Sequence, residues 1–194
     1  MRDRPILFSG AMVHAILEGR KSQTRRVVKP QAGGACAGCG ARVDSRHRVG
    51  GTRLWVREAF MPAPMEVAPT HPRATRWNIA YAAGGQAELE APAEYNPVLY
   101  NYERWTPSIF MPRWACRLVL EVTDVRVEKL QEISEADAEA EGVELQGGAA
   151  LWPHINRGDK MKSAYRDLWD RLSAKRAPWS SNPWVWVISF RRLP

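Results

Sequence analysis

The chain has 194 residues, 45% of them hydrophobic, which is enough for one domain with a real core. It carries 28 lysines and arginines against 21 aspartates and glutamates, and this formal charge of +7 favours an anionic partner, most often nucleic acid. Three cysteines argue against a secreted disulfide framework, the apolar run 6–8 is too short for a signal peptide, and no run approaches the ~18 apolar residues of a membrane span. We therefore expect a soluble, cytoplasmic protein, either a nucleic-acid binder or an enzyme that acts on nucleotides.

The first element is a short apolar run, 12–17, which predicts a helix that Ser9 and Gly10 can start. Gly19 is a natural left-handed residue at its end. A basic stretch follows, with Lys21 and Thr24 three residues apart on a tight turn before an extended run at 27–28. These two side chains can meet over one pocket, although a solvated basic turn would have the same composition.

The next part of the chain alternates between strands and irregular segments. Residues 31–51 are rich in glycine without an apolar period and predict a loop. The runs 54–60 and 77–82 predict strands. Four prolines make 61–76 irregular and 83–104 lacks a clear period, so we read the segments at about 31–50 and 61–104 as two loop-rich insertions in a single domain over 1–194.

The C-terminal half holds the clearest signals. Residues 116–127 predict a strand with a bulge or bend near Thr123, and Ser134 with Asp137 resembles a capping box that opens a helix over 135–141, ended by Gly142. Residues 145–158 predict a loop, 159–175 an amphipathic helix and 185–190 the last strand. The sequence therefore predicts an α+β protein, a small and mostly antiparallel β-barrel with flanking helices.

Two other groups of side chains have a possible ligand role and a plainer alternative. Cys36 and Cys39 have the spacing of zinc ligands, and His47 and Cys116 can complete a set of four. Neither belongs to a second paired motif, so we expect a reduced loop, no metal and no cofactor. Several tryptophans, among them Trp55, Trp77, Trp105 and Trp114, can stack on a base or fill the core.

The motif Gly19-Arg20-Lys21-x-x-Thr24-x-Arg26 after a short helix resembles the signature of ASCH-domain proteins, whose fold is a PUA-like β-barrel. The resemblance extends to four further segments, and the longer layout, including 111–115, is similar to phage-encoded ASCH proteins of unassigned function. The four segments are 51–58, 118–125, 134–142 and 185–190. The resemblance implies one PUA-like domain with a nucleoside or nucleic acid as its partner.

Small bacterial members of that superfamily include amidohydrolases that remove the acetyl group from N4-acetylcytidine. The resemblance implies Lys21, Thr24 and Glu141 as the catalytic set, with Thr24 as nucleophile and Lys21 as base, although Glu135 and Glu139 lie near Glu141. It implies no cofactor, a modified nucleoside or nucleobase as substrate, weak RNA binding, and a monomer or small homo-oligomer. Candidate substrate-binding residues are Arg26, Glu58, Trp55, Trp77 and Trp114. The alternatives are a non-catalytic RNA- or DNA-binding module and a ribonuclease.

Overall fold

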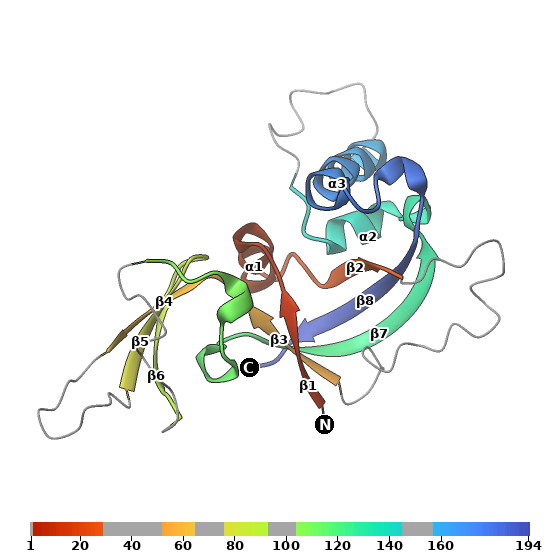
Figure 1. The fold of residues 1–194 in the computed structure, drawn as a ribbon. Helices are drawn as coiled ribbons and strands as arrows, with labels where there is room; N and C mark the ends of the chain where they lie inside the picture. The colour runs from red at the N-terminus through yellow and green to blue at the C-terminus, as the bar shows by residue number, and fades with distance from the viewer. Residues whose placement is uncertain (1, 29–51, 65–75, 93–103, 145–156) are drawn as a thin grey trace, which may run out of the picture. The chain divides into compact units, whose positions relative to one another are not determined.

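The computed structural model describes residues 2–28, 52–64, 76–92, 104–144 and 157–194 of the chain. It is an α+β protein with two sheets and three α-helices in this part of the chain (Figure 1). The strands are β1 (Arg2–Leu7), β2 (Gln23–Val27), β3 (Thr52–Arg57), β4 (Phe60–Pro64), β5 (Arg76–Tyr81), β6 (Gln86–Glu90), β7 (Val119–Lys129) and β8 (Trp184–Arg192). The helices are α1 (Gly10–Leu17), α2 (Glu135–Ala140) and α3 (Arg157–Ser173), with short 3-10 turns between some elements.

The predicted α+β class is confirmed, and the sheets have open strand orders. The larger sheet has the order β1-β3-β7-β8-β2, and the smaller has the order β4-β5-β6. No closed barrel is formed by the strands of the described ranges, so the barrel stays a prediction. The chain divides into two compact units. The first comprises Met1–His14, Arg53–Leu120 and Arg192–Pro194, and the second comprises Ala15–Thr52 and Glu121–Arg191.

The first unit contains the antiparallel three-stranded sheet. In β5, alternate residues are buried: Trp77, Ile79 and Tyr81 face a core that also contains Phe60 and Met111. This alternation is the expected pattern of a strand with one covered face. The outer strands have protected edges, because β4 contains prolines and β6 carries exposed glutamates.

Two irregular segments were predicted wrongly in this region. The prolines of 61–76 suggested no strand, yet Phe60–Pro64 pairs with β5, because an edge strand tolerates residues that cannot donate to a ladder. Residues 83–104 were expected to lack regular structure, yet Gln86–Glu90 pairs with the other side of β5. Its only large apolar residue is Leu89, so a strand signal based on hydrophobic alternation was too weak to detect it.

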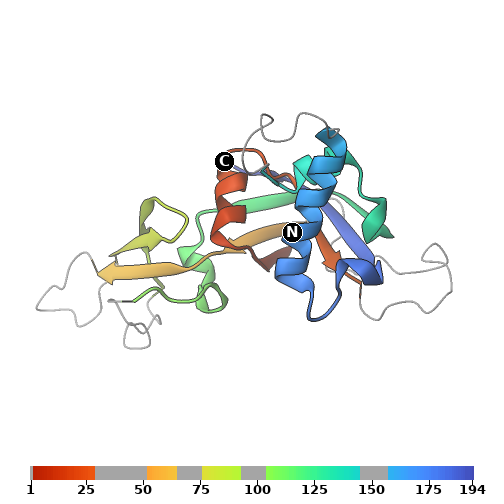
Figure 2. The same cartoon turned by 90° about the horizontal axis from the view of Figure 1, so that it is seen from above.

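The second unit places helices over one face of paired strands. Strands β2 and β8 are antiparallel, with Thr24 opposite Ile188. In both views α2 and α3 lie over the same face of these strands (Figure 1, Figure 2). Val185 and Val187 of β8 pack there against Tyr165 and Trp169 of α3. The amphipathic stripe predicted for 159–175 therefore covers the sheet, although the helix begins two residues earlier.

The capping box at Ser134 is confirmed only in its first half. The Asp137 backbone N–H donates to Ser134 Oγ at 3.0 Å, which starts α2 as expected. The Asp137 carboxylate is instead engaged by Arg126 and Arg25. Helix α2 ends at Ala140, Glu141 is its C-cap residue, and Gly142 follows with a φ of 78°.

Candidate active site

Lys21 is held at the start of β2 by backbone contacts on both sides. The turn after α1 uses Gly19 at a φ of 77°, and the Lys21 N–H then donates to the Ala15 carbonyl at 3.0 Å. Lys21 also forms an isolated antiparallel bridge with Glu141. A Cβ on Gly142 would lie 2.8 Å from Lys21 Cβ and 2.9 Å from Ala15 Cβ, so the approach of the two segments requires a glycine at that position.

The Lys21 ammonium is buried against three oxygen atoms. Its Nζ donates to Glu141 Oε2 at 2.7 Å and to the carbonyl oxygens of Gln23 and Glu141, both at 2.8 Å. The side chain has no exposed surface, since its exposed fraction is 0%. Burial lowers the pKa of Lys21 below its ordinary value of 10.5, and the attraction and hydrogen bond of Glu141 oppose this effect.

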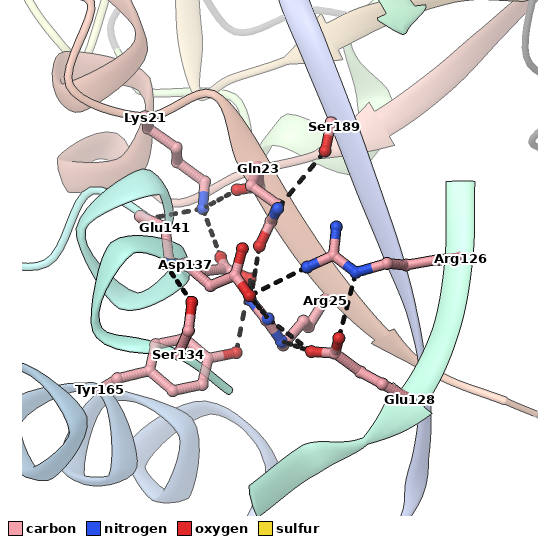
Figure 3. Close-up of polar contacts among 10 residues, drawn as sticks. All are labelled: Lys21, Gln23, Arg25, Arg126, Glu128, Ser134, Asp137, Glu141, Tyr165 and Ser189. Atoms are coloured by element: carbon pink, nitrogen blue, oxygen red, sulfur yellow. Dashed lines mark hydrogen bonds and ion pairs between the residues drawn. The ribbon is translucent and has the colours of Figure 1, made fainter. Parts of the chain in front are cut away.

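Glu141 receives donors from three side chains, and Figure 3 shows them converging on its carboxylate. Lys21, before β2, donates to Oε2. Arg25 Nη1, from β2, donates to Oε1 at 3.3 Å, and the Tyr165 hydroxyl, from α3, donates to the same oxygen at 3.5 Å. We call Lys21, Arg25, Glu141 and Tyr165 the Glu141 cluster. Its carboxylate is 3% exposed, so its charge is balanced by protein groups rather than by water.

Arg25 connects the Glu141 cluster to two further carboxylates, those of Glu128 and Asp137. Its Nη2 lies 2.6 Å from Glu128 Oε1 and 3.2 Å from Asp137 Oδ2, and Arg126 donates to both of these acids (Figure 3). Burial alone would lower the pKa of Arg25, but Glu141 and Glu128 outweigh it and raise that pKa. The arginine is therefore a permanent cation between three carboxylates.

Tyr165 is the buried hydroxyl of the cluster. Burial, followed by the negative charge of Glu141, raises its pKa well above the ordinary value of 10.0. The Arg25 guanidinium carbon lies 5.8 Å from the centroid of the Tyr165 ring. The phenol therefore stays protonated and is a donor to the carboxylate.

Thr24 is buried on β2, but its side chain leaves the strand on the face opposite to the cluster. Successive side chains of a strand point to opposite faces. Gln23 and Arg25, on either side of Thr24, both point toward the cluster, because Arg25 Nη1 donates to Gln23 Oε1 and to Glu141 Oε1. Within the part of the chain that the structure describes, no hydrogen bond joins the Thr24 hydroxyl to Lys21 or Glu141. The structure thus brings Lys21 and Glu141 together and leaves Thr24 beside them on the other face.

Arg26 follows on the same face of β2 as Thr24 and is half-buried. Burial lowers the pKa of its guanidinium, and the negative charge of Glu141 opposes this effect. The electrostatic coupling to Glu141 means that Arg26 belongs to the same neighbourhood as the Glu141 cluster.

The other candidate substrate-binding residues belong to the first compact unit. Both oxygens of Glu58 are occupied, because Arg117 donates to Oε1 and to Oε2, each at 2.9 Å. Arg117 also lies over the Tyr81 ring, 4.0 Å from its centroid, and we call Glu58, Arg117 and Tyr81 the Glu58 cluster. A base-reading role for Glu58 would require a substrate to displace the guanidinium.

The tryptophans proposed for base stacking are mostly packed inside that unit. Trp77 is 1% exposed and lies in the core, and Trp55 is buried beneath the Arg57 guanidinium at 4.6 Å. Trp114 is half-buried beside the same core as Trp77. Trp105 is half exposed, which makes it the tryptophan of the four with the largest accessible ring.

The predicted absence of a metal site is tested only within the described ranges. There, no group of three or more metal-ligating side chains occurs. Cys36, Cys39 and His47 lie outside the described residues. Cys116 donates its thiol to the carbonyls of Val56 and Leu118, and burial raises its pKa, which does not favour a reactive thiolate.

Sequence reasoning missed Arg25, Tyr165, Glu128 and Arg126 as members of this constellation. Arg25 lies at a variable position of the motif, where the sequence left open a solvated arginine or one that binds the substrate, and Tyr165 lies on the apolar stripe of the helix predicted over 159–175. A buried tyrosine usually bonds its hydroxyl, and this is the one signal that pointed beyond packing. No local pattern connects residues that are 116 positions apart, such as Arg25 and Glu141.

Comparisons with protein-family models, with curated proteins and with solved structures give no match. No helix among the described residues is long and apolar enough to span a membrane. The assignment of a function therefore depends on the sequence motif and on the geometry of the Glu141 cluster.

Proposed function

We propose that this chain is an ASCH-superfamily amidohydrolase with a PUA-like barrel, which cleaves the N4-acyl amide of acylated cytosine nucleosides or bases in the cytoplasm. The observation that carries the proposal is the buried contact of 2.7 Å between Lys21 and Glu141. These residues are 120 positions apart in the chain; the motif predicted Lys21, and Glu141 was predicted from its place near the end of the helix that Ser134 opens. A lysine whose pKa is lowered by burial gives up its proton more readily than an exposed lysine, so Lys21 is a candidate base.

The reaction converts an N4-acylcytosine and water into cytosine and a carboxylate. In the proposed route, Thr24 Oγ bonds to the acyl carbon as the carbon–nitrogen bond breaks. The hydroxyl proton passes through Lys21 to the departing N4 nitrogen. Water then attacks the acyl-threonine, which releases the carboxylate and restores the hydroxyl. Arg26, on the same face as Thr24, is the side chain we assign to positioning the substrate.

The position of Thr24 sets a condition on this route. Its hydroxyl lies on the opposite face of β2 from the cluster, and Lys21 Nζ lies against the Gln23 carbonyl. Catalytic hydrogen bonds often tighten only when substrate is bound. To accept the Thr24 proton, Lys21 must first lose a proton of its own, and the neutral amine must then turn from the carbonyl toward Thr24 when substrate binds. If it does not, Lys21 activates a water molecule, and the acyl carbon is attacked directly.

The test is a spectrophotometric assay of the whole chain with N4-acetylcytidine and N4-benzoylcytidine. We expect cytidine to form, and we expect Lys21→Met to abolish its formation. Thr52→Ala is the matched control for Thr24→Ala, because Thr52 is also a buried strand threonine, and we expect normal turnover from it. Absence of cytidine from the folded wild-type chain would overturn the proposal.

The second candidate is a non-catalytic RNA- or DNA-binding module, which the formal charge of +7 favours. The amidohydrolase should bind RNA weakly and lose that binding steeply with added salt, because counterion release dominates such contacts. Tight, sequence-selective binding that survives high salt, together with no cytidine formation, would favour the binding module.

A further inference from the structure

Three donors surround the Glu141 carboxylate, and both of its oxygens are occupied. Oε2 accepts from Lys21, and Oε1 accepts from both Arg25 and Tyr165. The three donors come from the turn before β2, from β2 and from α3, so together they fix the orientation of the carboxylate.

Lys21 has a different environment, because its partners accept rather than donate. Three oxygens surround Nζ, and they match the three N–H groups of the ammonium. Two of these partners are neutral carbonyls. When Lys21 loses a proton, it gives up one of these hydrogen bonds and retains two donors.

We propose that Arg25 and Tyr165 are positioning residues that hold the Glu141 carboxylate in place against Lys21, the group to which the proposed function assigns the proton transfer. This assignment rests on the proposed function for its catalytic meaning. It makes α3 part of the site through Tyr165, whereas the motif located only residues near β2 and α2.

The sign of each neighbour's effect on Lys21 follows from its charge. Glu141, from the end of α2, raises the pKa of Lys21, whereas Arg25 and Arg26, from β2, lower it together with burial. Tyr165, from α3, is neutral and acts through Glu141. Glu128 and Asp137 face Arg25 rather than Lys21 and balance its charge. Removal of the Arg25 charge should therefore raise the pKa of Lys21.

The test is an NMR titration of the folded chain that follows the Lys21 Nζ signal. Arg25→Gln should raise the pKa of Lys21, and Tyr165→Phe should raise it by less, because the carboxylate then interacts more strongly with the ammonium. Arg117→Gln and Tyr81→Phe are the matched controls from the Glu58 cluster, and both should leave the Lys21 titration unchanged.

Two results would overturn the proposal: an unchanged Lys21 titration in Arg25→Gln, or an equal change in the controls. If Arg25→Gln does not fold, Tyr165→Phe decides, since it keeps the ring and removes only the hydroxyl. An unchanged Lys21 titration in Tyr165→Phe would then overturn the proposal.

A kinetic measurement separates this inference from the proposed function. If the wild type forms cytidine, Tyr165→Phe should lower kcat by about 10-fold, as expected for one lost hydrogen bond to a charged group, with KM unchanged. If the wild type forms no cytidine, the proposed function fails, whereas the titration still decides whether Arg25 and Tyr165 control Lys21.

Discussion

Each compact unit buries a glutamate beside an arginine and a tyrosine, and the two clusters differ in how the carboxylate is shared. In the Glu58 cluster, one arginine occupies both oxygens at 2.9 Å and stacks on Tyr81, whose hydroxyl donates to the Ala115 carbonyl. In the Glu141 cluster, a lysine, an arginine and a tyrosine from separate elements share the two oxygens.

The difference separates a structural contact from a candidate active site. A bidentate arginine–carboxylate pair is complete and has fixed geometry, so it suits a role in folding. A carboxylate shared among several donors holds a lysine whose pKa burial lowers, and that lysine can exchange a proton. The same three residue types therefore need not imply the same role, and the donor arrangement decides between them.

The largest expected effect comes from removing each glutamate in turn. Glu141→Gln and Glu58→Gln both leave a buried cation without its partner, so each should lower the free energy of unfolding by about 3–5 kcal/mol. Urea denaturation measures this. Only Glu141→Gln should also abolish cytidine formation by the protein that remains folded. Equal loss of activity in Glu58→Gln would remove the distinction between the two clusters.

Thr24→Ala tests whether the threonine beside the Glu141 cluster is the nucleophile. We expect kcat to fall by ~10³-fold or more, equivalent to about 4 kcal/mol of barrier, while the fold remains intact. Thr24→Ser should keep part of the activity because the hydroxyl survives. Lys21→Arg should fail, because arginine stays protonated and cannot act as a base. Near-normal turnover in Thr24→Ala would instead show that water attacks the acyl group directly.

The pH dependence of the free energy of unfolding tests whether the Glu141 cluster holds a lysine with a lowered pKa. Because its pKa in the folded chain is lowered, the folded chain binds fewer protons than the unfolded chain between that pKa and 10.5. The free energy of unfolding should therefore rise with pH across this window. Lys21→Met should lose that rise, and Lys129→Met is the control. Parallel pH curves for wild type and Lys21→Met would mean that burial does not shift Lys21.

The strands that could be predicted from the sequence are those whose own residues show an apolar pattern. Residues 116–127 and 185–190 were predicted as strands because β-branched and apolar side chains fill a covered sheet, and they lie within or beside β7 and β8. Strand β6 was missed because its alternate residues are exposed glutamates. Such a strand is stabilised by pairing with β5 rather than by its own burial.

The site was predictable only where a motif fixed the residues. Lys21 and Glu141 were identified from a resemblance, and the structure brings them into contact. The partners of Glu141 were not predictable, because they converge from β2 and α3 only after the chain folds. The face of β2 that carries Thr24 also could not be read from the spacing of Lys21 and Thr24, because the start of the strand lies between them.

The smallest expected effect on the free energy of unfolding concerns an exposed ion pair, which serves as the reference for the two buried clusters. Arg76 and Glu88 lie 3.1 Å apart on the three-stranded sheet, with both side chains more than half exposed. Water already solvates both charges, so the pair gains little on forming and is screened by salt. Arg76→Gln should change the free energy of unfolding by less than about 1 kcal/mol, and added salt should reduce even that difference. A larger change would mean that burial is not what makes the Glu58 and Glu141 contacts stabilise the fold more than this exposed pair does. The 3–5 kcal/mol expected for Glu58 and Glu141 would then need a cause other than the loss of a buried partner.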